Sequence, residues 1–122
     1  MDCTCIDMDI DGDYSEKVSD KIVVAKLVHR CIECHNVIHP RDKYRSEVYA
    51  YDGSISRFKT CLVCNNIREE MFCGFEFGMI WEAVYEAIRN SDGNIPQCHI
   101  AALIPEARDK VCDAIEAYWE EG

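Results

Sequence analysis

The feature that most constrains this chain is a pair of Cys-x2-Cys motifs, Cys31/Cys34 and Cys61/Cys64, with 26 residues between them. A Cys-x2-Cys turn brings two sulfurs close enough to bind one ion. Two such turns supply the four tetrahedral ligands that a structural zinc site uses. We therefore predict that one Zn²⁺ is bound by Cys31, Cys34, Cys61 and Cys64. Iron bound as in rubredoxin is a weaker alternative, because neither motif has the Pro and Gly expected of that fold.

The cysteine content also bears on the cellular compartment. The chain has nine cysteines in 122 residues, an odd number that disulfides alone cannot use up. Its N-terminus lacks the basic-then-apolar pattern of a secretory signal, and no apolar run is long enough to span a bilayer. We therefore expect a cytoplasmic protein without a membrane partner, in which metal binding explains the cysteines better than disulfides do.

The segments around the two motifs predict a definite order of elements. Residues 21–28 are rich in β-branched side chains and predict a strand. The dipeptide Asp52-Gly53 suits the type I′ turn of a β-hairpin, and the residues on both sides favour strands. Thr60 is the expected N-cap of a helix over residues 61–71. A knuckle, a hairpin and a helix that carries the last two ligands form the treble-clef arrangement, whose helix N-terminus suits thiolate charge.

The C-terminal half predicts helices. Residues 79–90 and 105–121 have helical periodicity, and residues 98–103 add a helical turn. Pro105 suits the first position of the last helix. Cys112 follows the apolar stripe of that helix and is predicted to be a small core residue. The two apolar stripes consist of Ile80, Val84, Ala87 and Ile88, and of Val111, Ala114, Ile115, Tyr118 and Trp119.

These elements together predict an α+β fold in one compact domain. Residues 1–20 form an acidic arm, and residues 21–72 form a small treble-clef-like zinc module. Residues 73–122 form a helical part, with two or more helices, that packs on this module. A metal at the centre suits a chain of this length, because a small core benefits from such a cross-link.

The remaining cysteines raise the question of a second zinc site. One interpretation is a site that joins the N-terminal arm to the zinc module. The alternative is a pair of free thiols on that arm. The candidate ligands are Cys3, Cys5 and Cys73, completed by Cys98, His99 or a carboxylate.

The acidic residues near the N-terminus resemble a calcium-binding loop. Asp7, Asp9, Asp11 and Gly12 fall at positions one, three, five and six of such a loop. Position twelve, however, is Val18 rather than the bidentate glutamate that calcium requires. We therefore interpret this stretch as a solvated acidic segment.

Catalytic functions find little support in the sequence. A catalytic treble clef would be an HNH-type nuclease, which needs a histidine at the hairpin to activate water. The hairpin here carries Asp52 and no histidine, and the helix that follows has none either. The string from Cys31 to His35 fits a c-type haem attachment motif, but haem attachment requires export. No phosphate-binding loop or nucleophile elbow is present, and we predict that the protein is not an enzyme.

Several strings in this chain resemble a known group of proteins. The strings MDCTC, HRCIECHNVI, YDG, FKTCLVCNNIRE and FCGFEFGMIWEA, within residues 1–90, resemble small uncharacterised proteins encoded by tailed phages and prophages. The resemblance implies a phage origin, a bacterial host cell and a metal-binding role for Cys3, Cys5 and Cys73. The family pattern has a Cys-x-Cys at the last of these positions, where this chain has Met71 and Cys73. The fourth ligand of a second site therefore stays open.

The charge distribution favours interaction with another macromolecule. The net charge of −10 divides into −6 for residues 1–16, +5 for residues 17–68 and −9 for residues 69–122. We expect the protein to act through protein–protein contacts, as an inhibitor or adaptor of a host factor whose basic surface meets the acidic flanks. The candidate aromatic anchors for such contacts are Tyr49, Tyr51, Phe75, Phe77 and Trp119.

The basic middle region supports an alternative function, which is nucleic-acid binding. Arginine and lysine contact phosphates, and interleaved aromatic side chains can stack on bases. The low isoelectric point and the lack of a basic groove-reading helix argue against it. The candidate contact residues are Arg30, Arg41, Lys43, Arg45, Arg57, Lys59 and Arg68. The oligomeric state is not predicted by any feature of the sequence.

Overall fold

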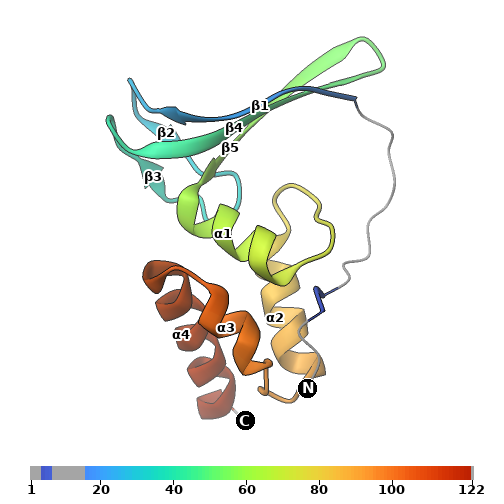
Figure 1. Cartoon of the computed structure of the whole chain (residues 1–122), viewed down its shortest axis with the longest axis vertical. Helices are drawn as coiled ribbons and strands as arrows, with labels where there is room; N and C mark the ends of the chain where they lie inside the picture. The colour runs from blue at the N-terminus through green and yellow to red at the C-terminus, as the bar shows by residue number, and fades with distance from the viewer. Residues whose placement is uncertain (1–3, 7–15, 122) are drawn as a thin grey trace.

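In the described part of the chain, the larger of two sheets has β1 (Glu16–Val24), β4 (Lys43–Tyr51) and β5 (Ser54–Cys61) in that order. A smaller sheet pairs β2 (His29–Arg30) with β3 (Val37–Ile38), and all these pairings are antiparallel. The computed structural model describes residues 4–6 and 16–121. Figure 1 shows the larger sheet at one end, α1 beneath it, and the other helices at the opposite end. The predicted α+β class is confirmed. The helices are α1 (Leu62–Met71), α2 (Ile80–Asn90), α3 (Gln97–Ala102) and α4 (Pro105–Glu121).

The hairpin of β4 and β5 forms as predicted. Asp52 and Gly53 connect the two strands with φ angles of 47° and 79°. Positive φ at both central residues is what a type I′ turn requires, and Asp-Gly tolerates it. The order of knuckle, hairpin and helix therefore matches the expected one, while the treble-clef assignment itself stays a prediction.

The first strand begins earlier than the sequence predicted. β1 starts at Glu16, which lies opposite Ala50, and pairs with β4 through a bulge between Lys17 and Ser19. The predicted acidic arm over residues 1–20 is therefore too long at its C-terminal end. Pairing with the long strand β4 extends β1 beyond the stretch that its own β-branched residues indicate.

The largest hydrophobic core lies among the helices. Ile80, Val84 and Ile88 of α2 are buried there, which confirms the stripe predicted for this helix. A second cluster surrounds four of the cysteines. Trp81 packs against both clusters and so connects the helical part to the cysteine-rich part.

The last helix has the predicted bounds but not the whole predicted apolar face. Val111 is fully buried, Cys112 is half-buried, and Tyr118 packs against the helical core. Trp119, in contrast, is 58% exposed, so this member of the predicted apolar stripe does not lie in the core. Its indole Nε1 donates a hydrogen bond of 3.3 Å to the carbonyl oxygen of Gly93, in the turn that follows α2. This contact with a distant turn holds the ring outside the core.

A pair of glycine substitutions should measure how firmly Trp119 is held. Gly53 and Gly93 have the same left-handed backbone, with φ of 79° and 80°. A Cβ at Gly53 meets open space, whereas one at Gly93 lies 2.7 Å from the Trp119 ring. We expect Gly53→Ala to cost about 1 kcal/mol of unfolding free energy from backbone strain. Gly93→Ala should cost about 1 kcal/mol more because the indole must move. Urea unfolding measures both, and equal losses would contradict this placement of Trp119.

Candidate metal centre

The four cysteines predicted as zinc ligands lie together in the structure. The four Sγ atoms of Cys31, Cys34, Cys61 and Cys64 all lie within 4.8 Å of one another. Cys31 and Cys34 belong to the turn between β2 and β3, Cys61 ends β5, and Cys64 lies in the first turn of α1. The Sγ atoms of Cys34 and Cys61 are 3.8 Å apart. This arrangement is close enough to bind a metal ion.

The helix that carries Cys64 begins one residue later than predicted. Cys61, with φ −63° and ψ 155°, is the N-cap of α1, and its sulfur accepts the backbone N–H of Cys64 at 3.5 Å. Thr60, the predicted N-cap, is fully buried within β5. The strand continues through Thr60, so the sulfur of the next residue takes the capping position that a hydroxyl usually fills.

Several N–H groups point at the clustered sulfurs. The backbone N–H groups of Glu33 and Cys61 each donate to the Sγ of Cys31 at 3.4 Å. The indole Nε1 of Trp81 donates to the Sγ of Cys64 at 3.4 Å. Hydrogen bonds of this kind stabilise thiolate charge and fix the orientation of metal ligands.

The four thiols affect one another's ionisation strongly. Hydrogen bonding from the Cys34 thiol lowers the pKa of Cys31, whereas hydrogen bonding with Cys31 raises the pKa of Cys64. Like charges so close together cannot all form without a compensating cation. A bound metal ion supplies that compensation and keeps all four sulfurs deprotonated.

Glu33, which sequence analysis did not identify, connects the metal centre to the helical part. It lies between Cys31 and Cys34 and is only 5% exposed. Its Oε1 accepts the backbone N–H of Ile80 at 3.2 Å, so the carboxyl caps the N-terminus of α2. Burial raises the pKa of Glu33, and hydrogen bonds from the N–H groups of Gly78 and Ile80 oppose that rise. No signal in the sequence marks this role, because the two groups are 47 residues apart.

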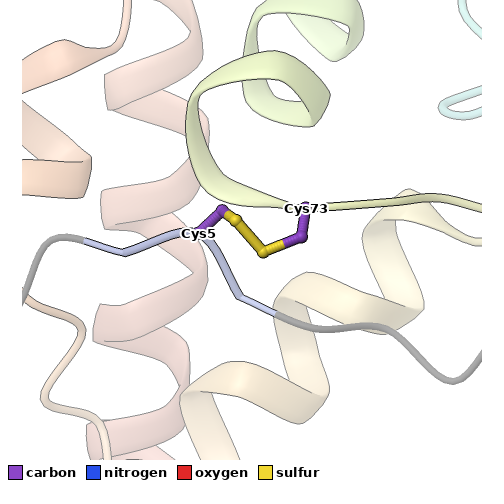
Figure 2. Close-up of a disulfide and its surroundings, with 2 residues drawn as sticks. All are labelled: Cys5 and Cys73. Atoms are coloured by element: carbon purple, nitrogen blue, oxygen red, sulfur yellow. A yellow bond between two sulfur atoms is a disulfide. The ribbon is translucent and has the colours of Figure 1, made fainter.

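The structure corrects the predicted second metal site. Cys5 and Cys73 are joined by a disulfide (Figure 2), and Cys98 is disulfide-bonded as well. A sulfur in a disulfide carries no thiolate charge and is not a metal ligand. His99 is buried in α3 and belongs to no metal-binding group among the described residues. Cys3, the remaining candidate, lies outside the described residues.

The predicted connection between the N-terminal arm and Cys73 is nevertheless present, with different chemistry. Ile6 pairs with Phe72 in a parallel bridge, and its N–H donates to the carbonyl oxygen of Met71 at 2.7 Å. The Cys5–Cys73 disulfide, whose two cysteines are 68 positions apart in sequence, covalently joins the same two segments. The calcium-like stretch with Asp7, Asp9 and Asp11 lies outside the described residues.

Two of the seven residues proposed for nucleic-acid contact are used within the fold. Arg68 is buried and forms an ion pair of 2.9 Å with Glu47, which is fully buried. Arg45 contacts Asp20 at 2.7 Å and Glu69 at 2.8 Å. Neither side chain is available for phosphate, because each already has carboxylate partners. The other candidates are Arg30, Arg41, Lys43 and Arg57, which are exposed, and Lys59, which contacts His29 at 3.0 Å.

The aromatic anchors predicted from the sequence also separate into two groups. Phe77 contacts both Tyr49 and Phe75, and it stacks on Phe58 with ring centroids 3.8 Å apart. Tyr51 and Trp119 are 50% and 58% exposed. The first group is half-buried, so the second group is the more accessible to a partner.

Comparison with protein-family models, with curated proteins and with solved structures finds no match to this chain. Among the described helices, none combines the length and the apolar character needed to cross a membrane.

Proposed function

We propose that the four-cysteine centre binds one Zn²⁺ and that the protein is a non-catalytic, zinc-stabilised module for protein–protein interaction. Zinc bound to thiolates has a Zn–S distance of about 2.3 Å, which gives a sulfur–sulfur separation of about 3.8 Å in a regular tetrahedron. The Cys34–Cys61 separation is 3.8 Å. Four sulfur donors in a tetrahedral cage suit zinc better than they suit the oxygen-preferring cations.

The observation that supports the non-catalytic role is that four cysteine sulfurs converge on one point, which is enough to fill every position of a tetrahedral zinc ion. A catalytic zinc keeps one position open for water or substrate. Cys31 and Cys64 are 1% and 0% exposed, so the protein itself closes two sides of the site. Such a centre stabilises a fold and orders nearby surfaces, and it supplies no activated water.

The centre lies where it can order both parts of the protein. Its ligands come from the β2–β3 turn and the β5–α1 junction, while Glu33 and Trp81 extend its contacts to α2. A rigid module of this kind suits a protein that acts by binding. The resemblance to tailed-phage proteins is the reason to propose a bacterial host factor as the target, with the protein as its inhibitor or adaptor.

The experiment that tests this function is capture of partners on the immobilised, zinc-loaded full chain. We expect one bacterial protein in near-stoichiometric amount from a nuclease-treated lysate, and its loss when Cys64→Ser removes the zinc. A metal-free surface should capture little because the interaction surface is no longer ordered. Mass spectrometry and densitometry of the eluate provide the measurement.

The same material tests the nucleic-acid alternative. Retention of a DNA or RNA pool at about 50 mM salt that is lost at higher salt would favour that alternative, since counterion release makes such binding strongest at low salt. Lys43→Glu and Arg57→Glu should then weaken it. Recovery of nucleic acid without a stoichiometric protein would overturn the proposed protein-binding function.

A further inference from the structure

Both tryptophans of the chain lie on one groove. A cavity of about 1170 Å³ lies between α2 and α4, and Trp81, Tyr85 and Trp119 are among its lining residues. Cys34 and Glu33 line the same cavity, so it borders the metal centre. The chain contains only two tryptophans. The groove therefore brings both tryptophans and Tyr85 to one surface.

Each tryptophan of this groove is oriented by a hydrogen bond to a residue outside the groove lining. Trp81 donates its indole N–H to the Sγ of Cys64, and its ring lies 6.0 Å from that of Tyr85. Trp119 donates to the carbonyl oxygen of Gly93. Tyr85 and Trp119 nevertheless remain 46% and 58% exposed. Aromatic rings that are oriented in advance and exposed lose little entropy on binding a partner.

The charges around the groove favour a cationic ligand. Its lining has four carboxyl side chains and two basic ones, from Glu33, Asp92, Asp113 and Glu121 against Arg89 and Lys110. Among the ion pairs of the described residues, none includes Asp92 or Asp113. Glu33 is 5% exposed, and its Oε2 has no hydrogen-bond partner. Four thiolates on one Zn²⁺ would add a charge of about −2 at the Cys34 end.

We propose that the groove between α2 and α4 binds a basic segment of a partner protein. Lysine or arginine side chains lie over the rings of Trp81, Tyr85 and Trp119 through cation–π contacts, and pair with Asp92 and Asp113. An acidic segment would meet the same carboxylates and be repelled. This inference rests on the proposed protein-binding function and adds to it a binding surface and the charge of the partner.

Tryptophan fluorescence gives a direct test, because both indoles lie on the groove. Zinc-loaded protein is titrated with a tryptophan-free peptide of alternating lysine, arginine and glycine, and with a glutamate–glycine peptide of equal length. We expect a saturable fluorescence change with the basic peptide only, weakened as salt is raised. Free arginine and spermidine are titrated in parallel.

Matched variants locate the binding. Asp113→Lys should weaken binding of the basic peptide about tenfold or more. Glu116→Lys makes an equal charge change outside the groove lining and should weaken that binding by about twofold at most. Trp119→Ala should weaken it about tenfold. Tyr51→Ala, which removes a similarly exposed aromatic at the end of β4, should leave it unchanged. Peptide binding by these Trp-retaining variants is followed by fluorescence, and binding by Trp119→Ala by calorimetry.

Several results would overturn the inference. These are the absence of a saturable change, equal binding of both peptides, or equal losses in Asp113→Lys and Glu116→Lys. Binding of free arginine or spermidine as tightly as the peptide would assign the groove to small cations instead. If a captured protein binds the Asp113→Lys and Trp119→Ala variants with the same affinity as it binds wild type, the proposed protein-binding function would stand. The groove would then not be the surface that binds this partner.

Discussion

A Cys64→Ser variant is expected to purify without zinc and without the native structure of the segment between β2 and α1. Cys64 is fully buried, provides one of the four clustered sulfurs and accepts the indole N–H of Trp81. A hydroxyl is a poor zinc ligand, and three thiolates without the ion would repel one another. Structural zinc contributes about 10 kcal/mol or more to folding in small zinc-dependent peptides, so the loss should far exceed that of an ordinary core substitution.

Elemental analysis and circular dichroism measure this effect. Wild type should hold one zinc per chain after dialysis, and a strong chelator should unfold it reversibly. Cys112→Ser is the matched control, because Cys112 is a free, half-buried cysteine outside the cluster and should retain one zinc. A Cys64→Ser protein that keeps its zinc would contradict the assigned centre. Two zinc ions per chain in wild type would contradict the Cys5–Cys73 disulfide.

Replacing Arg68 by methionine should destabilise the protein by about 3–5 kcal/mol, because it leaves a buried carboxylate without its main partner. Glu47 is 0% exposed and lies 2.9 Å from the Arg68 guanidinium, while its second ion pair, with Arg45, is longer at 3.5 Å and the Tyr49 hydroxyl donates to it at 3.2 Å. The guanidinium also lies 3.9 Å from the centre of the Phe75 ring. The loss of that packing adds to the cost.

Denaturant unfolding of zinc-loaded protein measures this loss. Arg45→Met is the matched control. Two of its partners, Asp20 and Glu69, are 25% and 56% exposed in their side chains, so water can solvate them and the cost should be about 1–2 kcal/mol. The double variant Glu47→Leu/Arg68→Met should recover most of the loss, since it removes both buried charges. A cost below about 1 kcal/mol for Arg68→Met would show that the pair is not desolvated.

The parts of the fold that were predicted well depend on local sequence. Asp52-Gly53 predicted the hairpin turn because few dipeptides tolerate two positive φ angles. The stripe of Ile80, Val84 and Ile88 predicted α2 because helical periodicity is a property of a short window. The predicted caps and ends were less accurate, as at Thr60 and at the start of β1. There, pairing with β4 decided how far each strand extends.

The basic candidates for nucleic-acid contact show a different limit. Arg45 and Arg68 are basic in the sequence, but Asp20, Glu47 and Glu69 neutralise them in the fold. Charge counting over a segment cannot detect this, because the partners come from separate elements. The same limit applies to Trp119, which belongs to the apolar stripe of the last helix but whose indole donates a hydrogen bond to the turn at Gly93.

The sequence by itself determined the four-cysteine cluster and the class of fold around it. Two cysteines in one short turn need little besides their own backbone to bring their sulfurs to a common point. The sequence spacing of Cys31, Cys34, Cys61 and Cys64 was therefore enough to predict the cluster. The tertiary structure alone decided the groove between α2 and α4, the capping of α2 by Glu33, and the disulfide of Cys5. Each of these features joins residues that are far apart in the chain. The relative position of such side chains depends on tertiary packing rather than on their spacing in the sequence.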